Sequence, residues 1–360
     1  MTLVECKREL QSFLQQKQMP ECKVTVMPDF FLDRFVTLDW DVAKFSERIS
    51  DVAKRKGGSI DGIRQTDMRG GNAINVASAL ANLGAKVTPI VCTSEYGLQQ
   101  IKFHSKNAPF DTSHIKTSGK ASITTALEFQ AQNGKTNVML RDLGALADFG
   151  PANLDEGDWT LIEDSDYVCL FNWAGTLKHG TALAQAVFER ARNGRGKTYC
   201  DTADPNPNVH AIAGLMEKVL KTDLVDILSL NENEAITYAA LLDESLNVKK
   251  QRLPFAELAM EAARVLAKHL PARIDLHTTS FSATVKGKSE VVMPTFKVNV
   301  LRATGAGDAW NAGNILGDKN SLSDECRLML ANAVSACYLS DADGLHPTKA
   351  KLAKFLNDNA

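Results

Sequence analysis

The stretch RATGAGDAWNAG, from Arg302 to Gly313, places two glycines and an alanine before an aspartate and a run with helical spacing. It follows the strand-like segment VVMPTFKVNV, so the glycines are expected to lie between a strand and the start of a helix. Backbone N–H groups at a helix N-terminus have no intrahelical partner and carry partial positive charge. We therefore expect the N–H groups of Gly305, Ala306 and Gly307 to bind an anion such as phosphate.

Asp308 follows these backbone groups directly. Its carboxylate can accept the proton of an attacking hydroxyl, and an ordinary pKa of about 3.9 keeps it ionised at neutral pH. Phosphoryl transfer needs such a base beside donors that stabilise the charge on the transferring oxygens. The alternative is that Asp308 only complements the dipole of the helix.

A second glycine pair lies early in the chain, in GGNAINVASALANLG, where a helix is expected to begin. Gly70 and Gly71 allow the backbone to approach a ligand closely. Asn72 and Asn75 are three residues apart in the first helical turn and share one face, where their amides can hydrogen-bond sugar hydroxyls. Helix capping is the alternative, and it suits Asn72 better than Asn75.

Beyond residue 151, short apolar runs alternate with helical patterns, as in DYVCLFN, KTYCDT and LVDILSLN, each of which precedes a helix-spaced segment. This alternation predicts an α/β fold with a mostly parallel sheet flanked by helices. Residues 121–129 and 136–142 alternate around Asn133–Gly134, which predicts a β-hairpin. Residues 30–68 are irregular and fit a peripheral appendage.

The composition limits the kinds of partner and the cellular compartment that we expect for this protein. With 41 basic and 43 acidic residues, the net charge of −2 gives no reason to expect nucleic acid or an anionic membrane as partner. The chain start lacks a secretion-signal core, no run could span a membrane, and seven scattered cysteines suit a reducing compartment, so we expect a soluble cytoplasmic protein. ARNGRGKT (residues 191–198) nearly matches a phosphate loop, but it runs from a helix into a strand, the reverse of that motif.

Four segments, GGNAINVASALANLGAKVTPIVCTSEYG (residues 70–97), LNENEA (residues 230–235), ATGAGDAWNAGNILG (residues 303–317) and ANAVSACYLS, resemble the ribokinase-like, phosphofructokinase-B carbohydrate kinase family. The resemblance implies Mg²⁺-dependent transfer of the terminal phosphoryl group of a nucleotide to a hydroxyl of a sugar or sugar phosphate. It also implies a central sheet with a small β-sheet lid. The core would comprise residues 1–29, 70–110 and 146–360, and the lid residues 30–69 and 111–145, through which two copies are expected to form a homodimer.

The resemblance also assigns roles to single residues. Asp308 matches the catalytic base, and Gly305, Ala306 and Gly307 match the anion hole. Asp33 matches an acceptor-binding aspartate, which would share the acceptor pocket with the following residues: Gly70, Gly71, Asn72 and Asn75.

Further residues match the nucleotide side. Asn231 and Glu234 match an NxxE motif that helps to organise phosphate and Mg²⁺, with Glu234 acting on the metal through water; a polar helix start is the alternative. Asn332 falls where a late helix passes the nucleotide base, and Thr304 lies beside the phosphate site.

Two features depart from the family pattern. Arg302 stands where the family usually has an acidic residue, and it is expected either to bind a phosphate or to be a solvated cation. The glycine-rich TxGxxG stretch is missing, and HTTSFSATVKG (residues 277–287) takes its place, similar to the equivalent strand of ADP-dependent sugar kinases. Both ATP and ADP therefore stay open as donors. His277 itself is expected to be a satisfied, partly buried histidine rather than a phosphate ligand.

Two other functions remain open. A nucleoside kinase would need a flat apolar slot for the base of its acceptor. A catalytically weak sugar- or nucleotide-sensing regulator on the same fold is favoured by Arg302 and the missing TxGxxG, and opposed by the intact TGAGD and NxxE motifs.

Overall fold

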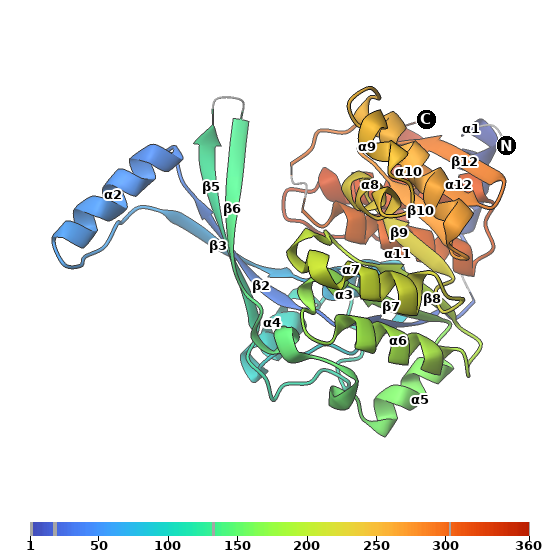
Figure 1. The fold of residues 1–360 in the computed structure, drawn as a ribbon, viewed down its shortest axis with the longest axis horizontal. Coiled ribbons are helices and arrows are strands. Elements are labelled where there is room, and N and C mark those ends of the chain that lie inside the picture. The colour runs from blue at the N-terminus through green and yellow to red at the C-terminus, as the bar shows by residue number, and fades with distance from the viewer. Residues whose placement is uncertain (1–2, 17–19, 132–133, 302–303, 360) are drawn as a thin grey trace.

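The computed structural model describes residues 3–16, 20–131, 134–301 and 304–359, which form one large and one small β-sheet with helices around them (Figure 1). The large sheet has eight strands, which are, in spatial order, β12 (Ser289–Pro294), β11 (Phe281–Lys286), β10 (Arg273–His277), β9 (Ile227–Leu230), β8 (Lys197–Asp201), β7 (Tyr167–Phe171), β1 (Lys23–Met27) and β4 (Lys86–Pro89).

The strands from β10 to β4 run parallel to their neighbours, and β11 and β12 add an antiparallel edge. Every residue of β7 and β9 is buried, as expected for parallel strands that are covered on both faces. The predicted α/β fold with a mostly parallel sheet is therefore confirmed.

Helices cover both faces of this sheet. Within the described residues the α-helices are α1 (Leu3–Leu14), α2 (Val42–Lys54), α3 (Asn72–Asn82), α4 (Glu95–His104), α5 (Glu156–Asp164), α6 (Gly180–Ala191), α7 (Ile212–Leu215), α8 (Glu232–Ala240), α9 (Ser245–Lys249), α10 (Phe255–His269), α11 (Ala306–Lys319), α12 (Asp324–Leu339) and α13 (Lys349–Asp358). One apolar core joins the sheet to α6, α8 and α10, and the opposite face packs against α3 and α11, with α12 outside α11. None of these helices is long and apolar enough to cross a lipid bilayer.

The small sheet has the order β3 (Arg64–Gly70), β2 (Phe31–Thr37), β5 (Ser122–Ala131) and β6 (Gly134–Asp142). Strands β5 and β6 pair antiparallel, which confirms the predicted hairpin, although Asn133 of its turn lies outside the described residues. The small sheet stands at one side of the large sheet, with α2 beyond it (Figure 1). The division into a core and a lid at residues 30–69 and 111–145 stays a proposal.

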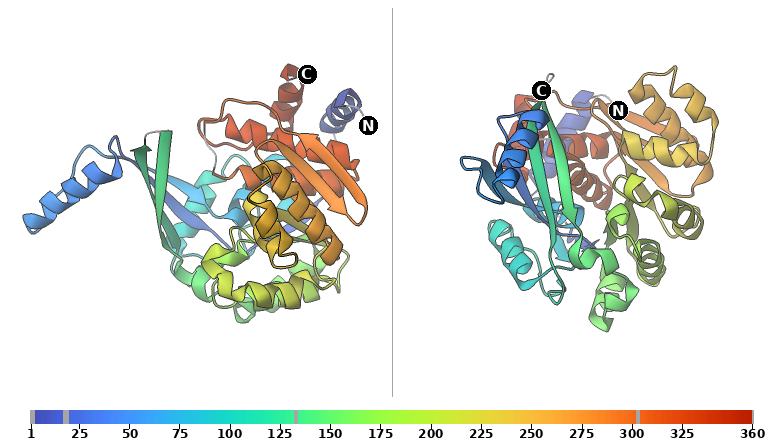
Figure 2. Two further views of the ribbon diagram at one scale, coloured as in Figure 1. Left: turned by 45° about the horizontal axis from the view of Figure 1, so that its top comes forward. Right: turned by 60° about the vertical axis from the view of Figure 1, so that its left-hand side comes forward.

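The prediction that residues 30–68 are irregular was wrong, because they contain β2, α2 and most of β3. Asp41 starts α2 by accepting a hydrogen bond of 2.8 Å from the backbone N–H of Lys44. No residue of α2 is buried, and its ring contact is between Phe45 and Phe129, with centroids 5.4 Å apart. The helix therefore projects from the body as an arm (Figure 2).

Two further expectations have clear outcomes. The segment before the TGAGD motif was expected to be one strand, but β12 ends at Pro294 and Thr295 to Val300 form no strand. Several of these residues line a cavity. The near-match to a phosphate loop runs from Ala191 at the end of α6 to Lys197 at the start of β8, which confirms a helix-to-strand turn.

Candidate active site

The two glycine motifs meet where α3 and α11 begin, although they lie more than 200 residues apart in the chain. Asp308 lies in the first turn of α11 and is only 5% exposed. The side-chain nitrogen of Asn72 donates to Asp308 Oδ1 over 2.9 Å, and that of Asn75 donates to Asp308 Oδ2 over 2.9 Å. The structure therefore brings the predicted base and both predicted asparagines together.

The contacts of these asparagines differ from the expectation that both amides face sugar hydroxyls. Their N–H groups are directed to the carboxylate, because a buried charge is costly unless donors surround it. Asn75 is itself 9% exposed, so its amide is held in place by the packing of α3. The two asparagines orient both oxygens of Asp308.

The pKa of Asp308 departs from the ordinary value assumed from the sequence. Burial raises the pKa of this carboxyl group to about 8, and the charges of Asp201 and Asp29 act in the same direction. The hydrogen bonds from Asn75 and Asn72 oppose this shift. A pKa raised to about 8 lies in the range that suits a general base near neutral pH.

The start of α11 is open to a ligand. Gly305 is its N-cap, with φ of 90° and no capping side chain, and a Cβ there would lie 2.7 Å from the hydroxyl oxygen of Tyr338. That hydroxyl donates to the carbonyl of Thr304 over 3.0 Å and fixes the turn. Ala306 and Gly307 line a cavity of about 660 Å³. The predicted anion-binding amides therefore border a space of ligand size.

Asp29 is a buried residue that the sequence analysis missed. Its Oδ1 accepts from the N–H of Ala73 and its Oδ2 from the N–H of Asn72, each over 2.9 Å, and Asn172 donates to Oδ2 over 2.8 Å. Asp29 thus caps α3 in place of Gly71, whose φ is 91°. Asp29 therefore occupies the backbone N–H groups of Asn72 and Ala73, and this contact positions Asn72.

Asp33 lies on β2 beside the glycine pair. A Cβ on Gly70 would lie 2.0 Å from Asp33 Oδ2, so the glycine is needed for this contact. Burial raises the pKa of Asp33 to about 6, while a hydrogen bond with Thr124 and the charge of Arg141 oppose the shift. The guanidinium of Arg141 lies 5.0 Å from the ring centroid of Phe31. The small sheet thus presents a carboxyl group and a cation beside the glycine pair.

Asn231 and Glu234 form a reciprocal cap at the start of α8. Asn231 Oδ1 accepts from the N–H of Glu234 over 3.0 Å, and the N–H of Asn231 donates to Glu234 Oε2 over 2.9 Å. The polar helix start considered from the sequence is therefore present. Burial raises the pKa of Glu234 well above its usual range, and the charge of Asp201 adds to the shift. A role toward Mg²⁺ stays a proposal.

Asp201 is the second residue that the sequence analysis missed. It ends β8, where its Oδ2 accepts from Asn311 Nδ2 over 2.7 Å and its Oδ1 accepts from the N–H of Ala203 over 3.0 Å. Its charge raises the pKa of both Asp308 and Glu234, so it lies near both motifs. The available signal was its position at the end of a buried strand, the edge at which open α/β sheets bind ligands.

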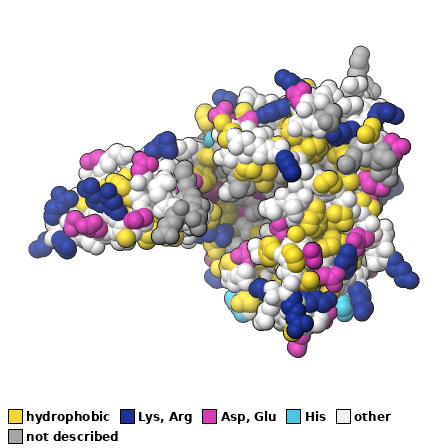
Figure 3. Space-filling model, turned by 90° about the horizontal axis from the view of Figure 1, so that it is seen from above, with side chains coloured by type: hydrophobic (Ala, Val, Ile, Leu, Met, Phe, Trp, Pro, Cys, Tyr) yellow, Lys and Arg dark blue, Asp and Glu magenta, His cyan; other side chains and the backbone are white. Residues whose placement is uncertain are grey.

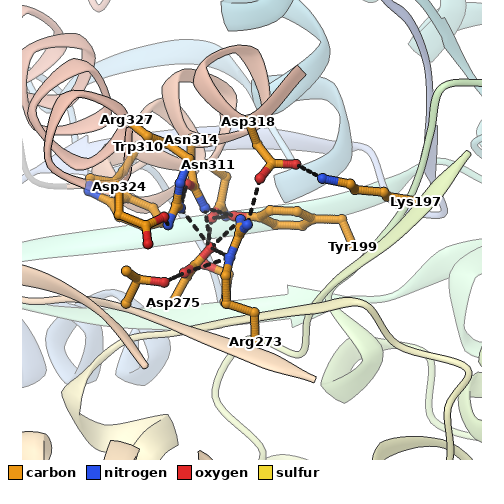
Figure 4. Close-up of polar contacts among 12 residues, drawn as sticks. Lys197, Tyr199, Arg273, Asp275, Trp310, Asn311, Asn314, Asp318, Asp324 and Arg327 are labelled. Carbon is orange, nitrogen blue, oxygen red and sulfur yellow. Dashed lines mark hydrogen bonds and ion pairs between the residues drawn. The ribbon is translucent and has the colours of Figure 1, made fainter. Parts of the chain in front are cut away.

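A buried polar network holds α11 against the sheet (Figure 4). Asn311 accepts from the hydroxyl of Tyr199 over 2.7 Å, and Asn314 Nδ2 donates to Asp275 Oδ2 over 2.8 Å. Arg327 of α12, only 1% exposed, donates to the same oxygen over 3.0 Å. Burial alone would raise the pKa of Asp275, but Arg273 and Arg327 hold it below its usual value. These contacts fix the start of α11 relative to β8 and β10.

The cavity beside α11 is lined largely by apolar groups from the segment after β12 and from α12. Asn332 stands in its wall, where Oδ1 accepts from Trp310 Nε1 over 2.9 Å and Nδ2 donates to the carbonyl of Pro294 over 3.0 Å. The body shows hydrophobic side chains on its upper face, whereas the arm carries many charged ones (Figure 3). Arg302 lies outside the described residues.

The fold and these residues are those expected of a phosphotransferase with an alcohol group as acceptor. A family model described as pfkB family carbohydrate kinase matches residues 41–350, and the chain belongs to this family. The resemblance noted from the motifs is therefore confirmed, and the protein is a carbohydrate kinase.

Similar proteins agree with this class. The ribokinase of Haemophilus influenzae is 28% identical over 295 residues, which cover 80% of this chain and 87% of that protein. The structure of Arabidopsis thaliana ribokinase with ribose and ATP matches with a TM-score of 0.70 at 16% identity, covering 94% of this chain and 99% of that one. The adenosine kinase of Sinorhizobium meliloti matches with a TM-score of 0.68 at 16% identity, covering 95% and 100%. At these identities, the two structures show the shared fold.

Proposed function

We propose that this kinase transfers the terminal phosphoryl group of ATP to a hydroxyl of a sugar or sugar phosphate, with Asp308 as the base. The main observation that supports this proposal is that Asn72 and Asn75 hold Asp308 beside the start of α11, which has no side-chain cap. The 28% identical ribokinase supports a sugar as acceptor, and the solved ribokinase that holds ribose and ATP supports ATP as donor. ADP as donor is the alternative that the experiment below separates.

In the proposed reaction, the acceptor oxygen attacks the terminal phosphorus while the bond to the bridging oxygen of the nucleotide breaks. The hydroxyl proton passes to Asp308, and the nucleotide leaves with one phosphate fewer. The N–H groups of Gly305, Ala306 and Gly307 stabilise the negative charge on the transferring oxygens. Asn72 and Asn75 hold the carboxylate in the orientation that accepts the proton.

The acidic groups near α8 fit Mg²⁺. Asp201, Asp204 and Glu232 each raise the pKa of Glu234, so negative charge is concentrated there, and oxygen is the donor that Mg²⁺ prefers. Within the described residues no group of three or more His, Cys, Asp or Glu side chains is arranged to hold a metal. Glu234 and Asn231 would therefore hold Mg²⁺ through water, and the ion would neutralise charge on the nucleotide phosphates.

The acceptor site is proposed between the glycine pair and the lid, residues 30–69 and 111–145. Asp33 would accept hydrogen bonds from sugar hydroxyls, and Gly70 and Gly71 would allow close approach of the backbone. The polar character of Asp33, Thr124 and Arg141 supports a sugar over a nucleoside. The nucleotide would occupy the cavity lined by Asn332, with Thr304 near its phosphates.

The assembly and location are further parts of the proposal. Edge strand β6 leaves Val138, Met139 and Leu140 between 46% and 57% exposed, and an exposed apolar edge favours pairing with a second copy, as a homodimer. Size-exclusion chromatography with light scattering would report twice the monomer mass. All seven cysteines are free and buried, which supports the cytoplasm as location.

The experiment is a screen of sugars, sugar phosphates and nucleosides against ATP and ADP separately, with phosphorylated product as readout. Asp308→Asn should abolish turnover while nucleotide binding persists, and Asp164→Asn, at an exposed position, should match the wild type. Product from Asp308→Asn at the wild-type rate would remove this residue from the mechanism. Binding of a sugar or nucleotide without product from either donor would favour the regulator instead.

A further inference from the structure

A small cavity of about 280 Å³ lies where the end of β3, α3, the end of α4 and the beginning of α13 come together. Its described lining shares no residue with the cavity beside α11 or with the candidate active site. Sites for drug-sized ligands measure roughly 300–1,000 Å³, so this cavity suits a smaller molecule. Asn107, Thr348 and Lys351 of its lining are exposed, so a ligand can reach it from solvent.

The lining of this cavity is polar and basic. It includes two cations and two imidazoles, which are Arg69, Lys351, His104 and His346, and no Asp or Glu among the described residues. Asp341, outside the lining, accepts an ion-pair contact of 2.6 Å from Lys351 Nζ, so the two cations and this carboxylate still leave one positive charge. The whole chain has a net charge of −2, so the positive charge is local to this place. Such a cavity attracts an anion.

The donor groups of the cavity are held in place and are close to one another. Arg69 Nη2 lies 2.9 Å from His346 Nδ1, and because a guanidinium group only donates, Nδ1 is the acceptor. The ring of His346 stacks on that of Tyr338 with centroids 4.7 Å apart, which fixes the acceptor. Burial lowers the pKa of His104, and the charge of Arg69 acts in the same direction, so these two side chains are neighbours. Arg69 and His104 are both partly exposed.

We propose that this cavity binds the phosphate group of a small molecule, with Arg69, His104 and Lys351 as donors. A phosphate group has three or more strong acceptor oxygens, whereas a carboxylate has two, so phosphate suits donors that come from several directions. The three donors belong to β3, α4 and α13, so a bound phosphate would join the end of the small sheet to the body. The site is separate from the catalytic one, and its binding does not depend on the proposed function.

The test is isothermal titration calorimetry with inorganic phosphate, glycerol 3-phosphate and succinate at constant ionic strength. Arg69→Met and Lys351→Met should each weaken phosphate binding by roughly tenfold or more, the usual effect of losing a hydrogen bond between charged groups. The matched controls are Arg34→Met on β2 and Lys354→Met on α13, which remove exposed cations outside the cavity and should leave phosphate binding unchanged. Succinate, a carboxylate of the same charge sign, should bind more weakly than phosphate.

The place of binding needs a second measurement, because phosphate could also bind at the start of α11. Crystals grown with selenate, a tetrahedral oxyanion, should show its anomalous signal between Arg69, His104 and Lys351. His104→Ala leaves the contact between Arg69 and His346 intact, so it serves as the test variant if Arg69→Met does not fold. Tighter binding of glycerol 3-phosphate than of inorganic phosphate would identify a phosphomonoester as the ligand, and the reverse would identify the free ion.

Four outcomes would overturn the proposal. They are the absence of saturable heat at millimolar phosphate, an equal loss in the control variants, succinate binding as tight as phosphate, and a selenate signal found only at the start of α11. Failure of the wild type to phosphorylate any acceptor would instead overturn the proposed function, and it would leave each of these binding results unchanged.

Discussion

Removal of one donor to Asp308 should move the pH dependence of the enzyme by a known amount. Asn75→Ala deletes the 2.9 Å hydrogen bond to Asp308 Oδ2, one of the contacts that oppose the raised pKa of about 8. A hydrogen bond to a charged group contributes about 1.5–3 kcal/mol, which equals a further rise of about 1–2 pH units. The carboxyl group of the variant should then ionise near pH 9–10, on the order of the sum of these shifts.

The assay is kcat/KM for the acceptor between pH 6 and 10, because this parameter reports the ionisation of the free enzyme. For the wild type, kcat/KM should rise with pH and level off above the pKa of Asp308, which is about 8. At pH 7 the variant should be about tenfold to hundredfold slower, and near pH 10 it should approach the wild type.

A matched control comes from the same helix. Asn82 lies in the last turn of α3, where its Nδ2 donates to the carbonyl of Ser78 over 2.9 Å, far from the carboxylate in sequence. Asn82→Ala should leave the pH at which kcat/KM rises unchanged. The role of Asn75 in setting the pKa of Asp308 would be refuted if the pH at which kcat/KM rises were unchanged in Asn75→Ala. It would also be refuted if kcat/KM fell by the same factor at every pH.

Three further substitutions have defined outcomes. Asp308→Asn should be more stable than the wild type at high pH, because the raised folded-state pKa makes the wild type lose stability between about pH 4 and 8; at pH 8 the difference should be about 5 kcal/mol, or about 7 °C in Tm, and it should vanish near pH 4. An equal Tm difference at both pH values would contradict this. Arg327→Met should cost about 3–5 kcal/mol in urea unfolding, because Asp275 loses a buried partner; a cost below about 1 kcal/mol would show that the network is not needed. Asp33→Asn should raise KM for the acceptor about tenfold and leave the Kd of ATP unchanged, and a change in ATP binding instead would place Asp33 outside the acceptor site.

The parts of the site that the sequence predicted depend on the backbone conformation of residues that are close together in the chain. The glycines before Asp308 and before Asn72 mark helix starts that need unusual backbone angles, and such positions are visible in any single sequence. The alternation of strands and helices likewise predicts the sheet. Both kinds of signal depend only on residues that are close together in the chain.

The parts of the site that the sequence did not predict depend on which strands become neighbours in the sheet. In the sequence, Asp201 and Asp29 stand at the ends of apolar strand segments, as many other polar residues do. Only the order of the strands in the sheet brings their charges near Asp308. The raised pKa of Asp308 comes from burial, which a sequence position does not disclose. The histidine at residue 277 is partly buried, as expected, but its Nε2 has no hydrogen-bond partner among the described residues, because its neighbours include a glycine and a tryptophan of a distant helix.

The connection between the small sheet and α3 has a consequence for proton exchange. Strand β3 ends at Gly70 and α3 begins at Asn72, so Gly71 alone separates a strand of the small sheet from a donor to Asp308. A rotation of the small sheet about Gly71 on binding of the proposed acceptor would change the donor geometry at Asp308. Sugar binding would then be linked to proton exchange with the solvent, and the measured binding enthalpy would depend on the ionisation enthalpy of the buffer.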